Sequence, residues 1–224
     1  MIALLGAMRK QMNGAVADAM RYYGEKYGLN YGVSLPTLRQ IANQEQPDHS
    51  LAQYLYKQQV RELRLAALHI AQPENITSNE ADFWAEGVIN SEVAEEMAFA
   101  MLSKAAEAKA IIDKWSDSDD ELLIYTALMA ASRNTKNISK ELILKVVNIA
   151  TRYNSSRIIA QGIVALLVAA NNTGDEKSII ASTITKIKEL AIVPQSGFST
   201  IHYIAEELEW RIEASEGGTM SVYQ

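Results

Sequence analysis

Residues 31–44 read YGVSLPTLRQIANQ, a stretch in which the chain leaves a tight bend and enters a helix. Gly32 supplies flexible backbone, and Ser34 can accept hydrogen bonds from the free amides at the start of a helix. Pro36 fits the first helical turn, where its missing N–H costs nothing. The stretch therefore predicts a helix that begins at about Leu35.

The rest of the chain is also predicted to be helical. Apolar residues recur at three- and four-residue spacing nearly everywhere, which predicts about twelve helices joined by short turns rich in Asn, Ser and Asp. Glycine (11) and proline (4) are sparse, and 48% of the 224 residues are hydrophobic, enough for a sizeable core. Helix pairs repeating at roughly 40 residues are typical of HEAT-like arrays.

We therefore predict an all-α fold, specifically a HEAT-like or armadillo-type α-α superhelix in which antiparallel helix pairs form a curved solenoid. It would be a single domain over residues 1–215, followed by a flexible tail over residues 216–224. A closed helical bundle remains the alternative, because no sharp sequence repeat is visible.

Local signals place individual helix starts and core residues. Thr77 and Glu80 have the spacing of a capping box. The run DKWSDSDDE at residues 113–121 predicts a helix capped by Asp at about Glu121 rather than a calcium loop, because it lacks the central Gly. The tryptophans are expected in the core or between repeats; they are Trp84, Trp115 and Trp210.

Charge is distributed unevenly along the chain. The net charge of −6 divides into +3 over residues 1–72, −10 over 73–121, +5 over 122–190 and −4 over 191–224. Overall acidity counts against a nucleic-acid binder, while the two basic blocks keep that function open if they line one surface.

Several chemistries and locations are excluded by composition. The absence of cysteine excludes disulfides, thiolate metal sites and thiol nucleophiles, and the three histidines lack ligand spacing, so we expect no metal and no cofactor. The start MIALLGAMRKQM lacks the pattern of a secretory signal, and no later stretch approaches a membrane span. A cytoplasmic monomer without a membrane partner is the expectation.

Two segments carry a family resemblance. The opening stretch is followed, after a short helix, by VRELRLAALHIA at residues 60–71. In order and spacing the two resemble the DNA alkylation repair family, the AlkD-like glycosylases built from HEAT-like repeats, in which a Gly-Val-x-x-Pro-x-Leu-Arg segment precedes a Glu-x-Arg-x-x-Ala helix. The matching residues are Gly32, Val33, Pro36, Leu38 and Arg39, then Glu62, Arg64 and Ala67. The resemblance runs from about residue 8 to about residue 190 and is sharpest in the first third.

The resemblance implies a base-excision enzyme that removes cationic N3- or N7-alkylated purines, with DNA, including alkylated duplex, as partner. Because alkylation makes the base a good leaving group, a carboxylate need only stabilise the oxocarbenium-like sugar. The family's catalytic segment, approximately Trp-Asp-x-Val-Asp, corresponds to SEVAE at residues 91–95. It implies Glu95 as the catalytic carboxylate and Glu92 as its acidic neighbour, with Ser91 where the Trp belongs.

The resemblance also implies that Arg39, Arg61 and Arg64 contact phosphates. Two alternatives stay open. Arg61 and Arg64 could instead form ion pairs between helices, and Glu92, Glu95 and Glu96 could be a solvated helix face. The cluster Tyr22, Tyr23, Tyr27 and Tyr31 is expected to pack the first helices, with stacking on bases as its alternative.

Other aromatic positions of the family are also replaced. Its Trp-x-x-Arg corresponds to Leu122 and Tyr125, and its late Trp falls in QGIVALLVAA at residues 161–170. We therefore predict a DNA-binding protein whose base excision is weak or altered. The alternative is a non-catalytic HEAT-like scaffold that binds a protein partner or structured nucleic acid, which the −10 block favours because phosphates would meet like charge there.

Overall fold

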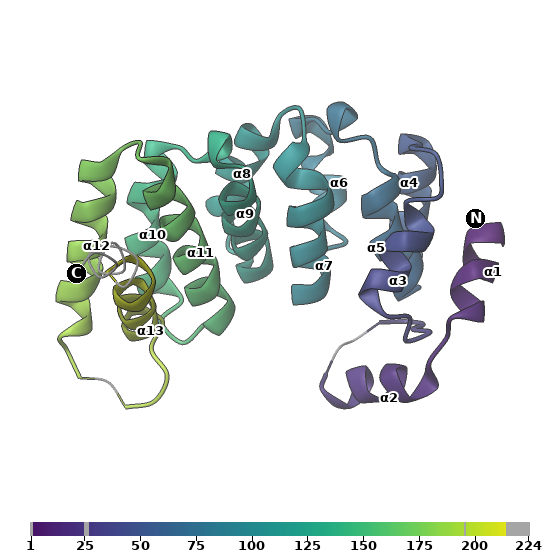
Figure 1. Cartoon of the computed structure of the whole chain (residues 1–224), viewed down its shortest axis with the longest axis horizontal. Coiled ribbons are helices and arrows are strands. Elements are labelled where there is room, and N and C mark those ends of the chain that lie inside the picture. Colours follow the sequence, from purple (N-terminus) through teal and green to yellow (C-terminus); the bar gives the residue numbers. More distant parts are fainter. Residues whose placement is uncertain (1, 25–26, 195, 214–224) are drawn as a thin grey trace, which may run out of the picture. The chain divides into compact units, whose positions relative to one another are not determined.

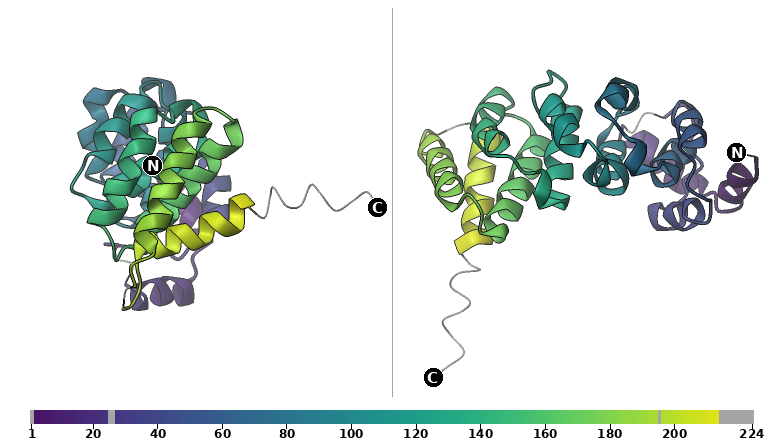
Figure 2. Two further views of the ribbon diagram at one scale, coloured as in Figure 1. Left: turned by 90° about the vertical axis from the view of Figure 1, so that its left-hand side faces the viewer. Right: turned by 90° about the horizontal axis from the view of Figure 1, so that it is seen from above.

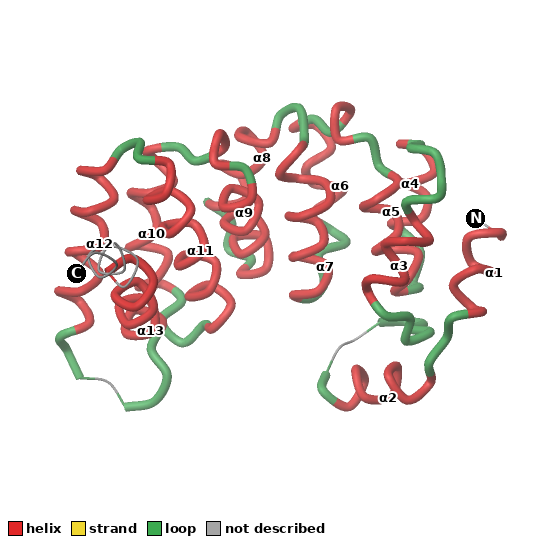
Figure 3. The backbone as a smooth tube through the Cα atoms, viewed as in Figure 1, coloured by secondary structure: helices red, strands yellow, loops and turns green. Residues whose placement is uncertain are grey.

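Every regular element in the described part of the chain is a helix (Figures 1 and 3). The computed structural model describes residues 2–24, 27–194 and 196–213; the expected flexible tail at residues 216–224 lies outside them. Over the described ranges the chain forms thirteen α-helices and no β-strand, which confirms the all-α prediction. None of these helices is both long and apolar enough to cross a membrane.

The chain divides into two compact units, residues 1–108 and 109–224. The helices of the first unit are α1 (Ile2–Lys10), α2 (Gly14–Tyr22), α3 (Leu35–Ala42), α4 (His49–Tyr56), α5 (Arg61–Ile70), α6 (Ala81–Ala85) and α7 (Ser91–Glu96). A π-helical segment, Met97–Met101, and a 3-10 turn, Leu102–Lys104, continue directly from α7. The single domain expected over residues 1–215 stays a prediction.

The second unit begins at the helix that spans the boundary and contains the longer helices. They are α8 (Ala108–Ser116), α9 (Glu121–Arg133), α10 (Lys140–Arg152), α11 (Arg157–Thr173), α12 (Lys177–Ala191) and α13 (Thr200–Leu208). Within this unit α9 packs against α11, and α10 packs against both α11 and α12 (Figure 2). A glycine, Gly162, lets α11 approach the side chains of Tyr125 and Leu128 on α9.

Two helix starts follow the sequence signals closely. Ser34 caps α3 and accepts the N–H of Thr37 at 3.3 Å, so this helix begins at Leu35 as predicted. Asp120 caps α9 and accepts the N–H of Leu122 at 2.8 Å, which confirms the second predicted start. Both caps are local, because donor and acceptor lie within three residues of each other.

The bend before α3 depends on Gly32. Its φ of +69° lies in the left-handed region that favours glycine. A Cβ at this position would lie 2.1 Å from the carbonyl oxygen of Asn13 and 2.8 Å from the amide nitrogen of Ala17. The amide of Asn13 also donates to the carbonyl of Tyr31 at 2.8 Å, so the bend is fastened to the start of α2.

The predicted capping box at Thr77 is wrong. Within the described residues, the Thr77 side chain makes no capping hydrogen bond, and a 3-10 turn rather than an α-helix follows it. Glu107 from the end of the unit supplies the acceptor instead, taking the N–H of Ser78 at 2.8 Å and its hydroxyl at 2.6 Å. The carboxylate of Glu80 contacts His49 at 3.1 Å, so it is engaged in a tertiary contact.

Two of the three tryptophans lie in the core as expected. Trp84 and Trp115 are 1% and 2% exposed. The expectation is wrong for Trp210, which is 70% exposed in the π-helical segment that follows α13. The guanidinium of Arg211 lies 5.8 Å from the ring centroid of Trp210.

Gly32→Ala should lower the free energy of unfolding by at least about 2 kcal/mol, because a left-handed L-residue costs about 1–2 kcal/mol before the clash with the Asn13 carbonyl is added. The measurement is urea unfolding. The matched control is Gly6→Ala in α1, where a Cβ meets no atom within 4 Å and alanine should raise stability slightly. If the two variants lost the same free energy of unfolding, the bend would not depend on glycine at position 32.

Candidate functional site

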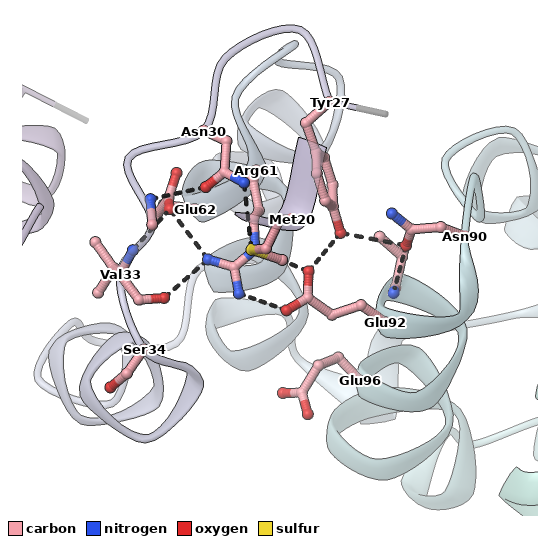
Figure 4. Close-up of polar contacts among 12 residues, drawn as sticks. Met20, Tyr27, Asn30, Val33, Ser34, Arg61, Glu62, Asn90, Glu92 and Glu96 are labelled. Atoms are coloured by element: carbon pink, nitrogen blue, oxygen red, sulfur yellow. Dashed lines mark hydrogen bonds and ion pairs between the residues drawn. The ribbon is translucent and has the colours of Figure 1, made fainter. Parts of the chain in front are cut away.

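The two segments that carry the family resemblance are joined by a buried pair of charged residues on α5. The carboxylate of Glu62 accepts the N–H of Tyr31 at 3.1 Å and that of Val33 at 3.3 Å. Arg61 donates through Nη1 to the carbonyl oxygen of Val33 at 2.8 Å and to Glu62 at 3.1 Å (Figure 4). Since Arg61 and Glu62 are 3% and 0% exposed, α5 holds the backbone of the bend from inside the protein.

Arg61 also reaches across to α7. Its Nε donates to Oε2 of Glu92 at 2.8 Å, and its Nη2 donates to Oε1, so the contact is bidentate (Figure 4). The hydroxyl of Tyr27 donates to the same carboxylate at 2.6 Å. Burial raises the pKa of Tyr27, and the nearby Glu92 charge raises it further, so this hydroxyl stays a neutral donor.

Asn90 connects Tyr27 to the start of α7. Its side-chain oxygen accepts the hydroxyl of Tyr27 at 3.2 Å and the N–H of Val93 at 3.0 Å. It thereby caps α7, whose first turn carries Glu92. The position of the Glu92 carboxylate is therefore set by the helix cap as well as by Arg61.

A second ion-pair cluster lies one turn further along α7. Arg39 of α3 donates through Nε to Oε2 of Glu96 at 3.1 Å and through Nη2 to Oε1. His69 of α5 lies with Nε2 2.7 Å from Oε2 of the same carboxylate, and the ring of Phe99 lies 5.0 Å from the Arg39 guanidinium. Burial raises the pKa of Glu96, but the hydrogen bonds from His69 and Arg39 outweigh it and hold the pKa below its ordinary value.

The solvated-face alternative is wrong for two of the three glutamates on α7. Glu92 and Glu96 are four residues apart, share one face and bind arginines, and Glu96 is only 1% exposed. Glu95 is displaced around the helix from both and is exposed to solvent. The structure thus separates the two acids that the resemblance implies as catalytic: Glu92 is engaged with Arg61, while Glu95 lies at the surface.

The three arginines expected to contact phosphates also lie in different environments. Arg61 is buried and fully engaged, as the ion-pair alternative describes, which argues against a direct phosphate contact from it. Arg64 is 5% exposed and donates to two backbone carbonyls. Arg39 is the most accessible of the three, with 36% of its side chain exposed beside Glu96.

The first tyrosines do not all pack as expected. Tyr22 and Tyr23 are 85% and 82% exposed at the end of α2, with ring centroids 5.3 Å apart in an edge-to-face arrangement. Arg21 precedes them and pairs with Asp18 at 3.3 Å on the surface. The packing expectation is wrong for this pair, and the stacking alternative stays open for it.

The basic block of the second unit is partly neutralised by the acidic block before it. Lys145 lies 2.7 Å from Asp117, and Arg152 pairs with Asp119. Both acids belong to the loop between α8 and α9. Sequence position alone overstates the positive charge available on α10.

The second unit contains an aromatic cavity of about 300 Å³ between α9, α11 and α13. Tyr125, at the position of the family's Trp-x-x-Arg segment, lines it together with Met129, Gln161 and Tyr203. The sequence did not predict Tyr203 as a member of this lining, because it lies far along the chain from any matched motif. Across the described ranges, no group of three or more His, Asp or Glu side chains could hold a metal ion.

Comparison with known proteins gives one family and one solved structure. A family model described as "DNA alkylation repair enzyme" matches residues 4–185. A solved chain described as "A new family of proteins related to the HEAT-like repeat DNA glycosylases with affinity for branched DNA structures" is similar with a TM-score of 0.69 and 16% identity, covering 92% of this chain and 93% of that one. This likeness confirms the HEAT-like fold. No curated protein sequence matches.

Acid should destabilise the protein partly through Glu96. Because the folded-state pKa lies below the ordinary value of 4.5, the stabilisation is complete above that value and is lost as pH falls through the lower, folded-state pKa. Glu96→Gln should therefore cost about 3 kcal/mol at neutral pH and flatten the acid limb of the stability profile. The measurement is urea unfolding at a series of pH values from neutral down into the acid range below 4.5.

The matched control for this prediction is Glu95→Gln, on the same helix but exposed. It should change stability by less than about 1 kcal/mol. If both variants lost the same stability and the same pH dependence, Glu96 would not be the buried partner of Arg39 and His69.

Proposed function

Since the chain belongs to the DNA alkylation repair enzyme family, we propose that it binds DNA and excises cationic N3- or N7-alkylated purines only weakly or with altered preference. The family model covers residues 4–185, which include both units in large part. The expected cytoplasmic location and monomeric state belong to the same proposal.

The observation that carries the proposal is the division of roles among the acids of α7. A carboxylate that stabilises a sugar cation must be accessible to the substrate. Glu92 and Glu96 are turned inward toward Arg61 and Arg39, with side chains 18% and 2% exposed, so neither suits that role. The exposure of Glu95 supports its assignment as the electrostatic stabiliser, with Glu92 as a neighbour that acts through Arg61.

Weak activity follows from the residues around Glu95. Its carboxylate stands one methylene further from the backbone than that of an Asp, and an ångström of displacement can cost on the order of a hundredfold in rate. Ser91, where the family's segment has Trp, offers no ring to pack against the sugar or backbone.

The DNA-binding part is supported by two accessible features of the first unit. Tyr22 and Tyr23 present their rings to solvent beside Arg21, an arrangement suited to stacking on unpaired bases next to a phosphate. Arg39 is accessible enough for a phosphate contact. Because unpaired bases occur at junctions, and because the structurally similar chain comes from a family with affinity for branched DNA, we propose branched DNA as the preferred form.

The alternative is a non-catalytic scaffold for a protein partner or structured nucleic acid. It is favoured by the net charge of −6 and by the −10 block that includes α7. The pairing of Lys145 and Arg152 with acids of that block removes positive charge that phosphates would require.

Fluorescence anisotropy should show tighter binding to a four-way DNA junction than to a linear duplex of equal length, with affinity falling as salt rises. Replacing Tyr22 and Tyr23 by Ala should weaken junction binding about tenfold if the rings stack on bases. Tyr54→Ala, an exposed tyrosine on α4, is the control. Equal, salt-insensitive binding to both DNAs would instead support the protein-binding scaffold.

Excision is tested by single-turnover release of N7-methylguanine and N3-methyladenine from alkylated duplex. We expect slow release that falls to the spontaneous rate in Glu95→Gln, because the sugar cation then lacks its carboxylate. Glu74→Gln, also exposed but in the 3-10 turn after α5, should keep the wild-type rate. Release that survives unchanged in Glu95→Gln would remove Glu95 from the mechanism. No release by the wild type at saturating protein would leave DNA binding without the chemistry.

A further inference from the structure

The first unit contains a second cavity, of about 360 Å³, away from the acids of α7. It lies between the end of α4, the first turn of α5 and the end of α6. Its polar and aromatic lining consists of Tyr56, Lys57, Gln59, Arg64, Phe83 and Glu86. The cavity therefore has two cationic residues and one acidic residue in its walls.

Arg64 is the unusual member of this lining. It is only 5% exposed, yet across the described residues no carboxylate oxygen lies at ion-pair distance from it. Its guanidinium donates to the carbonyl oxygens of Gly87 at 3.3 Å and Gln58 at 3.5 Å and lies 5.9 Å from the Tyr56 ring centroid. Arg39 and Arg61, by contrast, each have a carboxylate partner.

A buried guanidinium without a counter-ion is energetically unfavourable. Removing a cation from water is unfavourable unless an anion or strong acceptors compensate it. The two carbonyl contacts of Arg64 exceed the usual length of 2.7–3.2 Å for such hydrogen bonds, so they compensate it poorly. The planar fork of N–H donors matches an oxyanion that enters from the cavity.

The other charges around the cavity favour an anion as well. Lys57 lies 5.0 Å from the Phe83 ring centroid, which holds its ammonium group at the wall. The Gln59 side chain can donate a further hydrogen bond. Glu86 opposes an anion, but it is exposed, so water screens its charge, whereas Arg64 acts from a buried position. The lining carries one net positive charge.

We infer that this cavity binds a phosphate group, with Arg64 as the principal ligand and Lys57 as a second cation. Phosphate suits the site because its several oxygens can accept hydrogen bonds from donors on different walls. The inference rests on the proposed function only for the origin of the group, a DNA phosphate; free phosphate is the other source.

The test is thermal unfolding of the full chain in inorganic phosphate and in chloride of matched ionic strength. Phosphate at ten times its Kd should raise the Tm of the wild type by about 4 °C. Arg64→Met keeps a long apolar stem without the charge and should lose this rise. Arg157→Met, an exposed arginine at the start of α11, should keep it. A rise of equal size in the wild type and Arg64→Met would overturn the inference.

Lys57→Met is the second variant, because this exposed residue can change without endangering the fold. It should reduce affinity for phosphate about tenfold, and unchanged affinity would count against the site even if Arg64→Met failed to fold. In the DNA arm, anisotropy compares wild type, Arg64→Met and Arg157→Met on the same junction. A loss specific to Arg64→Met supports a DNA phosphate as the occupant.

The two sources and the two proposals separate in these measurements. A phosphate-dependent Tm rise that requires Arg64, with equal DNA binding by wild type and Arg64→Met, supports the site with free phosphate as its occupant. The same rise without any DNA binding by the wild type would refute the proposed function and leave the site standing. DNA binding without an Arg64-dependent response to phosphate or to DNA would refute the site alone.

Discussion

The buried charges of Arg61 and Glu62 are the constraint on which the first unit depends. Glu62 accepts hydrogen bonds from the amides of Tyr31 and Val33, and Arg61 donates one to the carbonyl oxygen of Val33. Gly32 lies between those amides in a conformation that favours glycine, against the backbone of Asn13. The two segments shared with the DNA alkylation repair family therefore form one hydrogen-bonded unit. Its buried backbone groups and charges satisfy one another, as buried polar groups must.

The same hydrogen-bonded unit determines which acids of α7 face inward. Arg61 extends from the bend to Glu92, and Arg39 from the helix after the bend binds Glu96. Two acids of α7 are thus committed to holding α3, α5 and α7 together, whereas Glu95 lies on the exposed side of the helix. The proposed excision depends on the exposed acid of α7, and the proposed phosphate site depends on a buried arginine that has no carboxylate at ion-pair distance among the described residues.

The sequence predicted the features that depend on neighbouring residues. Helical periodicity and the caps at Ser34 and Asp120 were readable because each interaction spans a few residues. The hydrogen bond at Ser78 could not be predicted from neighbouring residues, because its acceptor, Glu107, lies 29 residues away. The partners of Glu92 and Glu96 come from α3, α5 and the loop after α2, so a helix-face pattern alone predicted solvated acids where the structure has two ion-paired ones. The prediction for Trp210 was wrong in the opposite direction: it was expected to be buried and is exposed, because burial there depends on what surrounds the end of α13.

The most direct measurement is a double-mutant cycle between Arg61 and Glu92, using Arg61→Leu, Glu92→Leu and the double variant in urea unfolding. If the pair is the link between the bend and α7, each single change strands a buried charge, and the double variant should be more stable than the sum of the two losses predicts by at least about 2 kcal/mol. Losses that add to within about 0.5 kcal/mol would contradict the link and return Glu92 to the candidates for catalysis.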